Sequence, residues 1–299
     1  MEKWYAGIVV GVDGSDEASH ALEWAAAEAD RHGAPLTVLS TFTLPTVAAP
    51  TFSLADARSE AEDAVRNALG QLAGRRPGSH RVVGEVVPGG AANVLVQRSR
   101  TCDLVVVGRR GLTGFDRVLL GSVSAAVAAM AYGPVAVVPR GAQVTVPRRV
   151  VAAVGTDDQR APVLQLAFEE AAARSCPLSI VHGIDPGLLA GALPGYATMP
   201  ESWREWALGA VSDEANRWAE KYPQVVYDIA VREGRPREVL LEHLRGDDLV
   251  VVGGRRHSPV VGRMLGSVPD RLLRAAPCAV VVAHMQTARS AAPGVEVVG

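Results

Sequence analysis

The sequence predicts an α/β protein made of two doubly wound domains, and three observations support this fold class. The chain of 299 residues is long enough for two domains of ordinary size. Apolar residues make up 48% of the chain, yet only 5% of residues are aromatic, a balance typical of α/β proteins with buried parallel strands. The second half of the chain repeats the first, so one prediction of fold serves for both halves.

The repeat extends over nearly the whole chain. IVVGVDGSDEASHALEWAAAEA, which begins at residue 8, aligns with VVAAVGTDDQRAPVLQLAFEEA, which begins at residue 150. DLVVVGRRG at residue 103 aligns with DLVVVGGRR at residue 248, so the offset grows from 142 to 145 residues. An offset of this length indicates two whole domains of common origin rather than short solenoid units. We predict domains over 1–140 and 149–285, a linker over 141–148 and a disordered tail over 286–299.

Short apolar segments alternate with helical patterns in the first copy. The first helical pattern begins after Ser15 and Asp16, which form a suitable N-cap, and it carries apolar residues with helical spacing. Elements that alternate in this way predict a parallel sheet with right-handed crossovers. The apolar segments are rich in β-branched residues, as expected of strands covered on both faces, and lie near 8–12, 36–41, 81–87, 104–108 and 135–138.

Composition excludes several classes of function. A net charge of −2 and an isoelectric point of about 6.4 predict no nucleic-acid partner and no anionic membrane surface. No apolar run reaches the roughly 18 residues that a membrane span needs, and the N-terminal residues lack a secretory signal pattern. The cysteines have no metal or disulfide spacing, and we expect all three (Cys102, Cys176 and Cys278) in the core. We therefore expect a cytoplasmic protein.

The glycine-rich segment after the fourth predicted strand is the main candidate for a functional site. Gly108 ends the strand, Gly111 follows, and Gly121 and Ser122 begin a predicted helix. Ligands of open α/β sheets lie at the carboxyl ends of strands, where a helix N-terminus supplies free N–H groups and a positive dipole end. The hydroxyls of Ser122 and Ser124 add donors. This layout favours a nucleotide phosphate, although the glycine spacing taken alone is explained as well by tight turns.

The two common phosphate-binding motifs are missing. GxxxxGK[ST] does not occur in the chain, and GxGxxG is absent from the turn after the first predicted strand. The sequence therefore does not support a P-loop enzyme or a dinucleotide-binding domain.

The pattern Gly108-x2-Gly111-x9-Gly121-Ser122, continued by Val123 and Ser124, resembles that of ATP-binding universal stress proteins. VVGVDGS at the first strand also resembles the opening strand of that family, and both halves share the likeness, as in the tandem-domain members of actinobacteria. The resemblance implies two Rossmann-like domains, each with a five-stranded parallel sheet of order 3-2-1-4-5 and helices on both faces. It also implies that the last strands, Val135–Val138 and Ala279–Ala283, pair the two domains about a pseudo-twofold axis in a chain that forms homodimers.

The resemblance further implies an ATP site in the first copy, with or without Mg²⁺. Asp13 would face the ribose or a nucleotide-bound Mg²⁺, and the backbone of Thr41 would meet the adenine. The other residues implied around the nucleotide are Gly11, Val12, Gly108, Gly111, Gly121, Ser122, Val123 and Ser124.

Several of these residues have a second explanation. Asp13 stands where a helix N-cap would stand, and Thr41 has the ordinary β propensity of a strand end. Arg109 and Arg110 lie in the glycine turn, where they either pair with phosphate oxygens or form a solvated surface pair.

The second copy departs from the pattern at three positions. Gly155 stands where the first copy has Asp13, Arg256 where it has Gly111, and Pro269 where it has Ser124. One hydroxyl is lost, the carboxylate is lost unless Asp157 or Asp158 reaches back, and Arg256 either strains the turn or adds a phosphate contact. We therefore predict a second, weaker nucleotide site formed by Ala153, Gly183, Gly253, Arg256, Gly266, Ser267 and Val268.

No catalytic residue and no protein metal site are predicted. The seven histidines lack HxxxH and HExxH spacings, GxSxG is absent, and we interpret His182 and His257 as structural or ligand-adjacent. Trp203, Trp206 and Trp218 have helical spacing and predict an apolar face in the core or at an interface.

The expected function is an ATP-dependent regulator or switch in the stress response, with an unidentified protein partner. The alternatives are a nucleotide-free scaffold or dimerisation protein and a slow ATP-hydrolysing enzyme of the same superfamily. An adenylyl transferase or N-type ATP pyrophosphatase would carry an HxGH-type or SGGxDS-type signature near the first strand, and VVGVDGSDE has neither.

Overall fold

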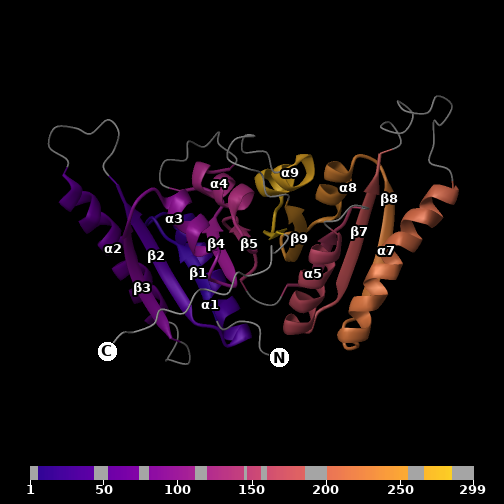
Figure 1. Ribbon diagram of the computed structural model, residues 1–299, viewed down its shortest axis with the longest axis horizontal. Helices are drawn as coiled ribbons and strands as arrows, with labels where there is room; N and C mark the ends of the chain where they lie inside the picture. Colours follow the sequence, from indigo (N-terminus) through magenta and orange to yellow (C-terminus); the bar gives the residue numbers. More distant parts are fainter. Residues whose placement is uncertain are drawn as a thin grey trace, which may run out of the picture.

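The computed structural model of the protein describes residues 6–43, 53–73, 81–111, 120–144, 147–155, 160–185, 201–254 and 266–284. Its strands form one ten-stranded sheet in the order β3-β2-β1-β4-β5-β10-β9-β6-β7-β8 (Figure 1). The strands of the first copy are β1 (Ile8–Gly11), β2 (Leu36–Phe42), β3 (Val82–Pro88), β4 (Leu104–Gly108) and β5 (Val135–Val138). Those of the second are β6 (Arg149–Ala153), β7 (Leu178–Ile184), β8 (Tyr227–Glu233), β9 (Asp248–Gly254) and β10 (Ala279–His284).

Each copy has the predicted strand order. The first follows 3-2-1-4-5 with all neighbours parallel, and the second, β8-β7-β6-β9-β10, repeats that order. The predicted strands of the first copy agree with the observed ones to within one residue at each end. For β1, β4 and β5 the prediction succeeds because these strands are short, β-branched and almost wholly buried, so the apolar run and the strand coincide.

Helices cover both faces of the sheet. One apolar core lies under α1 (Asp16–His32), α2 (Leu54–Ala73), α5 (Arg160–Arg174) and α7 (Glu201–Lys221). The other lies under α3 (Ala91–Arg98), α4 (Ser122–Met130), α8 (Pro236–His243) and α9 (Ser267–Ala275). Successive side chains of a strand point to opposite faces of the sheet, so Val9 of β1 enters one core and Val10 enters the other.

Two expectations about packing have a clear outcome. The three cysteines are buried, as predicted. The tryptophans of α7 divide: Trp218 packs against the core, whereas Trp206 is 65% exposed and so does not belong to the core of this chain.

The two copies join edge to edge at the centre of the sheet. Strands β5 and β10 are antiparallel neighbours, with Val137 opposite Val280, Ala136 opposite Val281 and Val135 opposite Val282. This pairing confirms that the last strands connect the two domains within one chain. It also satisfies the backbone groups of two strands that would otherwise be open edges.

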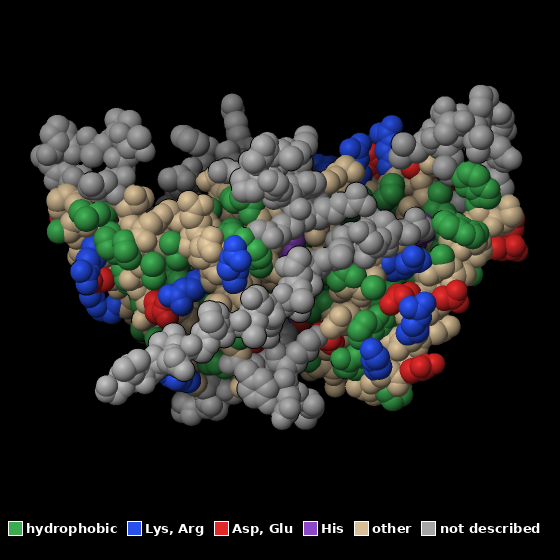
Figure 2. Space-filling view, viewed as in Figure 1, with side chains coloured by type: hydrophobic (Ala, Val, Ile, Leu, Met, Phe, Trp, Pro, Cys, Tyr) green, Lys and Arg blue, Asp and Glu red, His purple; other side chains and the backbone are tan. Residues whose placement is uncertain are grey.

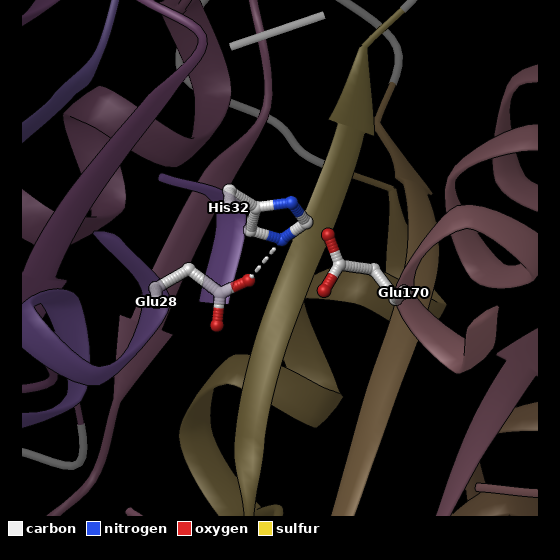
Figure 3. A group of neighbouring side chains, drawn as sticks. All are labelled: Glu28, His32 and Glu170. Carbon is white, nitrogen blue, oxygen red and sulfur yellow. Dashed lines mark hydrogen bonds and ion pairs between the residues drawn. The ribbon is translucent and has the colours of Figure 1, made fainter. Parts of the chain in front are cut away.

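A buried group of charges bridges the copies beside this pairing. Glu28 of α1 and Glu170 of α5 occupy equivalent positions of the repeat, because their numbers differ by the offset of 142. The guanidinium of Arg174 donates to both carboxylates, at 2.6 Å to Glu28, and all three side chains are at most 4% exposed. Figure 3 shows the two carboxyl groups approaching from opposite sides, with the imidazole of His32 between them. His32 Nε2 lies 2.8 Å from Glu28 Oε1.

The two carboxyl groups differ in electrostatic environment. Burial alone would raise the pKa of Glu28, but Arg174, His32 and Arg31 together hold this pKa at about 2. Burial raises the pKa of Glu170, because Arg174 only partly compensates and Glu28 adds repulsion. The ion-pair network therefore depends on one cation, Arg174, that serves both copies.

Replacing Arg174 by alanine should destabilise the protein strongly. The Arg174→Ala variant leaves two carboxylates buried without their shared cation, and we expect the free energy of unfolding to fall by about 3–5 kcal/mol. Denaturant unfolding measures this loss. The matched control is Arg58→Ala, which removes a solvent-exposed pair with Glu62 on α2 and should cost less than about 1 kcal/mol. Equal losses in the two variants would contradict the assignment.

Candidate functional site

A pocket of about 390 Å³ lies at the carboxyl ends of β1, β2 and β4. Strand β1 stands between β2 and β4 in the sheet, so the chain winds away from it in both directions, and ligands of open α/β sheets bind at such a reversal. The pocket brings together eleven of the predicted site residues: Gly11, Val12, Asp13, Thr41, Gly108, Arg110, Gly111, Gly121, Ser122, Val123 and Ser124. Residues without a recognisable motif complete the lining: Ala18, Leu39, Ser40, Ala91, Leu95 and Val107.

The first turn of α4 forms one wall of this pocket. Its N-cap residue is Gly121, and no described side chain caps the helix, whereas α1 is capped by Ser15 Oγ, which accepts from Ala18 N–H at 3.1 Å. The first backbone N–H groups of a helix have no intrahelical acceptor. The N–H groups of Ser122, Val123 and Ser124 therefore create an anion site with the positive end of the helix dipole behind it.

Two glycines of the turn have close neighbours, which are backbone atoms for Gly108 and the end of a side chain for Gly111. A Cβ at Gly108 would lie 3.0 Å from backbone atoms of Glu17, so this glycine lets the first turn of α1 pack on the end of β4. A Cβ at Gly111 would lie 2.3 Å from Asp13 Oδ2. Asp13 Oδ1 accepts the N–H of Ser15 at 3.0 Å, while Ser15 is the N-cap of α1, so the alternative that Asp13 caps this helix is wrong. The Asp13 carboxylate therefore lies beside Gly111 of the glycine turn, and both residues line the pocket.

The two arginines of the turn do not behave as either sequence interpretation expected. Arg109 is absent from the pocket lining, and its guanidinium donates to the carbonyl of Ala276 at 3.0 Å, at the end of α9 in the second copy. Arg110 lines the pocket, but its Nε donates to Glu17 at 2.7 Å and its backbone N–H to the same carboxylate at 2.6 Å. Arg109 thus joins the copies, and Arg110 is held by a buried carboxylate.

The hydroxyl of Ser124 also differs from the prediction. Ser124 is buried, and its Oγ donates to the carbonyl of Gly108 at 2.6 Å. A hydroxyl has one hydrogen to donate, so Ser124 offers a ligand its backbone N–H rather than the expected side-chain donor. The bond ties the start of α4 to the end of β4.

The second copy has an equivalent pocket of about 370 Å³. It contains six of the predicted residues, Ala153, Gly183, Gly253, Gly266, Ser267 and Val268, whereas Arg256 lies outside the described residues. Pro269 has no N–H, so the first turn of α9 offers the N–H groups of Ser267 and Val268 only. Gly155 supplies no carboxylate. Among the described residues, the second pocket therefore offers a phosphate one backbone N–H fewer than the first.

Outside the pockets, one group in the described part of the chain has the spacing of a metal site. Ligand atoms of Glu28, His32 and Glu170 lie within 4.8 Å of one another. However, Arg174 and Arg31 already neutralise the two carboxylates, and a divalent cation would add two uncompensated charges to a buried site. This group fits an ion-pair network better than a metal ion.

Basic and acidic side chains are interspersed on the face shown in Figure 2, so this face carries no large patch of one charge. Among the described residues, no helix combines the length and apolar character needed to cross a bilayer.

Comparison with known proteins identifies the class. The model of the universal stress protein family matches residues 5–139 and again residues 147–284. A universal stress protein of Mycolicibacterium smegmatis is 32% identical over 291 residues, covering 92% of this chain and 96% of the relative. One from Mycobacterium tuberculosis is 31% identical over 311 residues, covering 93% and 95%.

A solved structure agrees on the fold. The crystal structure of a universal stress protein from Archaeoglobus fulgidus covers 93% of this chain and 98% of its own, with a TM-score of 0.64 and 18% identity. The chain therefore belongs to the universal stress protein family, in a tandem arrangement of two family domains.

Because Asp13 lies close to Gly111, we expect the effects of substitutions at these two positions on stability to be coupled. In the second copy both members are replaced, by Gly155 and Arg256. Gly111 has no positive φ, so Gly111→Ala strains only the contact with Asp13. We expect Gly111→Ala to destabilise the protein, and to cost about 0.5–3 kcal/mol less when Asp13→Gly is also present. Denaturant unfolding of the four proteins of this double-mutant cycle gives the coupling energy. Additive effects would show that the two positions are independent.

Proposed function

We propose that the protein is a cytoplasmic, homodimeric regulator that binds ATP in the first pocket and changes its state or partner with nucleotide occupancy. The observation that carries the proposal is the uncapped first turn of α4, which faces the Asp13 carboxylate across a pocket of about 390 Å³. Phosphates would accept from the N–H groups of Ser122, Val123 and Ser124. Asp13 would contact the ribose or a nucleotide-bound Mg²⁺.

The other end of the pocket suits an adenine ring. Val12, Leu39, Ala91 and Leu95 supply apolar contacts, and Thr41 stands at the end of the strand beside them. Such a combination of an apolar slot with a few polar groups is typical of small-molecule sites. The separation of an apolar end from an anion-binding end supports a nucleotide rather than a free phosphate ion.

A switch requires that the pocket be connected to the rest of the molecule, and Arg109 supplies a connection. Its backbone carbonyl accepts the N–H of Gly121 at 2.8 Å, at the start of α4, while its guanidinium donates to Ala276 of the second copy. A phosphate that orders the glycine turn would therefore act on a residue that contacts both copies. This arrangement supports regulation, in which occupancy alters the relation between domains.

Replacing Gly121 by aspartate should weaken ATP binding while leaving the start of α4 able to form. Gly121 has the extended backbone of an ordinary N-cap, with φ −68° and ψ 152°, and aspartate is a favourable N-cap residue. Its carboxylate would accept the same N–H groups that we assign to phosphate. We expect calorimetry to show at least about a 10-fold loss of ATP affinity at the tighter site, with at most a small fall in the melting temperature, because a Cβ at residue 121 would lie 3.3 Å from the carbonyl oxygen of Arg109. Gly209→Asp, at an open position of α7, is the matched control for the added charge. Unchanged ATP affinity in Gly121→Asp would refute the site.

We also propose that the pocket does not catalyse rapid hydrolysis. Among the described residues, the ionisable side chains that line it are those of Asp13 and Arg110, and Arg110 is paired with Glu17. Phosphoryl transfer at enzymatic rates depends on groups that stabilise the transition state more than the bound substrate, and backbone N–H groups that grip all phosphates alike do not favour it. We expect ATP to remain largely intact over minutes with Mg²⁺ and the purified protein, as followed by release of inorganic phosphate. Turnover near about 1 s⁻¹, lost in Asp13→Asn, would support the enzymatic alternative instead.

A further inference from the structure

A carboxylate from outside the glycine pattern holds the turn of the first pocket. Glu17 lies in the first turn of α1, two residues after the N-cap Ser15, and its side chain is only 8% exposed. Gly108 makes this approach possible, because a Cβ at that position would lie 3.0 Å from the backbone of Glu17. The start of α1 and the end of β4 therefore pack closely enough for Glu17 to reach the turn that follows β4.

Both oxygens of the Glu17 carboxylate bind Arg110. Oε2 accepts the backbone N–H of Arg110 at 2.6 Å, and Oε1 accepts the Nε–H of its side chain at 2.7 Å. The first bond fixes the backbone of the turn, and the second fixes the direction of the guanidinium. The second bond uses one of the five N–H donors that a guanidinium carries, so pairing with Glu17 is compatible with contact to a second anion.

Arg110 lies beside the anion-binding wall of the same pocket. A Cβ at Gly121, the N-cap of α4, would lie 3.4 Å from Arg110 Cα, so the turn adjoins the start of the helix. The Arg110 side chain is 33% exposed and lines the pocket, whereas the described lining does not include Glu17. A guanidinium in this place adds a cation to the N–H groups of the helix, and both attract phosphate.

The orientation of Arg110 affects how tightly it binds a phosphate. An arginine side chain loses rotamer freedom when it contacts a ligand, and that loss weakens binding. Because Glu17 holds the Nε of Arg110 in the ligand-free protein, most of this ordering takes place during folding. The Glu17 charge also repels phosphate, but its two bonds to Arg110 offset that charge. We therefore expect the gain from orientation to exceed the repulsion.

We propose that Glu17 is a positioning residue for the nucleotide phosphates and acts through Arg110, whose terminal amino groups it directs toward phosphate oxygens. The inference rests on the proposed function, because it takes the ATP site of the first pocket as given. It goes beyond that function by naming a residue outside the glycine pattern on which phosphate affinity depends. Glu17 then affects the phosphate end of the ligand and not the nucleoside end.

The test measures ATP binding by calorimetry, and adenosine binding by displacement of ATP, in the full chain, Glu17→Gln, Arg110→Gln and the double variant. Glutamine is the residue of the second copy at this position, Gln159, and its amide oxygen still accepts a backbone N–H. We expect Glu17→Gln to weaken ATP binding about 3- to 10-fold and to change adenosine binding less than about 2-fold. In the Arg110→Gln background, Glu17→Gln should leave ATP binding unchanged or strengthen it, because it then removes only a repulsion.

A second variant keeps the test decisive if Glu17→Gln fails to fold. Arg110→Lys retains the positive charge and a partner for Glu17 at a partly exposed position, but it loses the planar, oriented guanidinium. We expect it to weaken ATP binding about as much as Glu17→Gln does. The matched control is Glu62→Gln, which removes an exposed carboxylate that pairs with Arg58 on α2 and should leave ATP binding unchanged.

Three results would overturn the positioning role. They are ATP affinity that is unchanged or higher in Glu17→Gln, a loss in Glu17→Gln that is equal in both backgrounds or equal for ATP and adenosine, and full ATP affinity in Arg110→Lys. Failure of the unsubstituted chain to bind ATP, or of adenosine to displace it, would contradict the proposed function instead. The two failures are therefore distinguishable.

Discussion

The antiparallel pairing of β5 with β10 is the constraint on which the rest of the molecule depends. It turns two five-stranded sheets into one sheet of ten strands and fixes the two copies about a pseudo-twofold axis. That geometry brings α1 against α5, so Arg174 can serve carboxylates from both copies. It also brings the glycine turn of the first pocket within reach of the end of α9, where Arg109 donates to the carbonyl of Ala276. Neither contact exists in a single domain.

The two pockets show how a duplicated site diverges through few residues. The first copy has an aspartate and a glycine at positions 13 and 111, where a Cβ on residue 111 would meet the end of the Asp13 side chain, and the second copy has Gly155 and Arg256 at these positions. At the helix, Pro269 removes one N–H donor from the second copy. At the opposite end, His182 replaces Ser40. The strand order is the same in both copies, and the differences lie in the residues that line the two pockets.

Much of this could be predicted from the sequence, and the limits have physical causes. Strands such as Leu104–Gly108 are signalled by continuous apolar residues, and glycines before a helix mark the carboxyl end of the sheet, so the fold and most of the first pocket were accessible. The partners of Arg109 and Arg110 were not, because Ala276 and Glu17 lie 167 and 93 residues away along the chain. Leu95 and Ala91 carry no motif and enter the pocket only through packing of α3. His182, interpreted from the sequence as structural or ligand-adjacent, lines the second pocket.

Hydrogen exchange of backbone amides, measured with and without ATP, tests the central claim most directly. Exchange reports the protection of individual segments without any substitution. The account predicts that ATP slows exchange in the first turn of α4, at Ser122–Ser124, and in the turn from Gly108 to Gly111, with little change at the start of α9. Protection confined to other segments, or equal protection of the first turns of α4 and α9, would contradict the assignment of the first pocket as the ATP site.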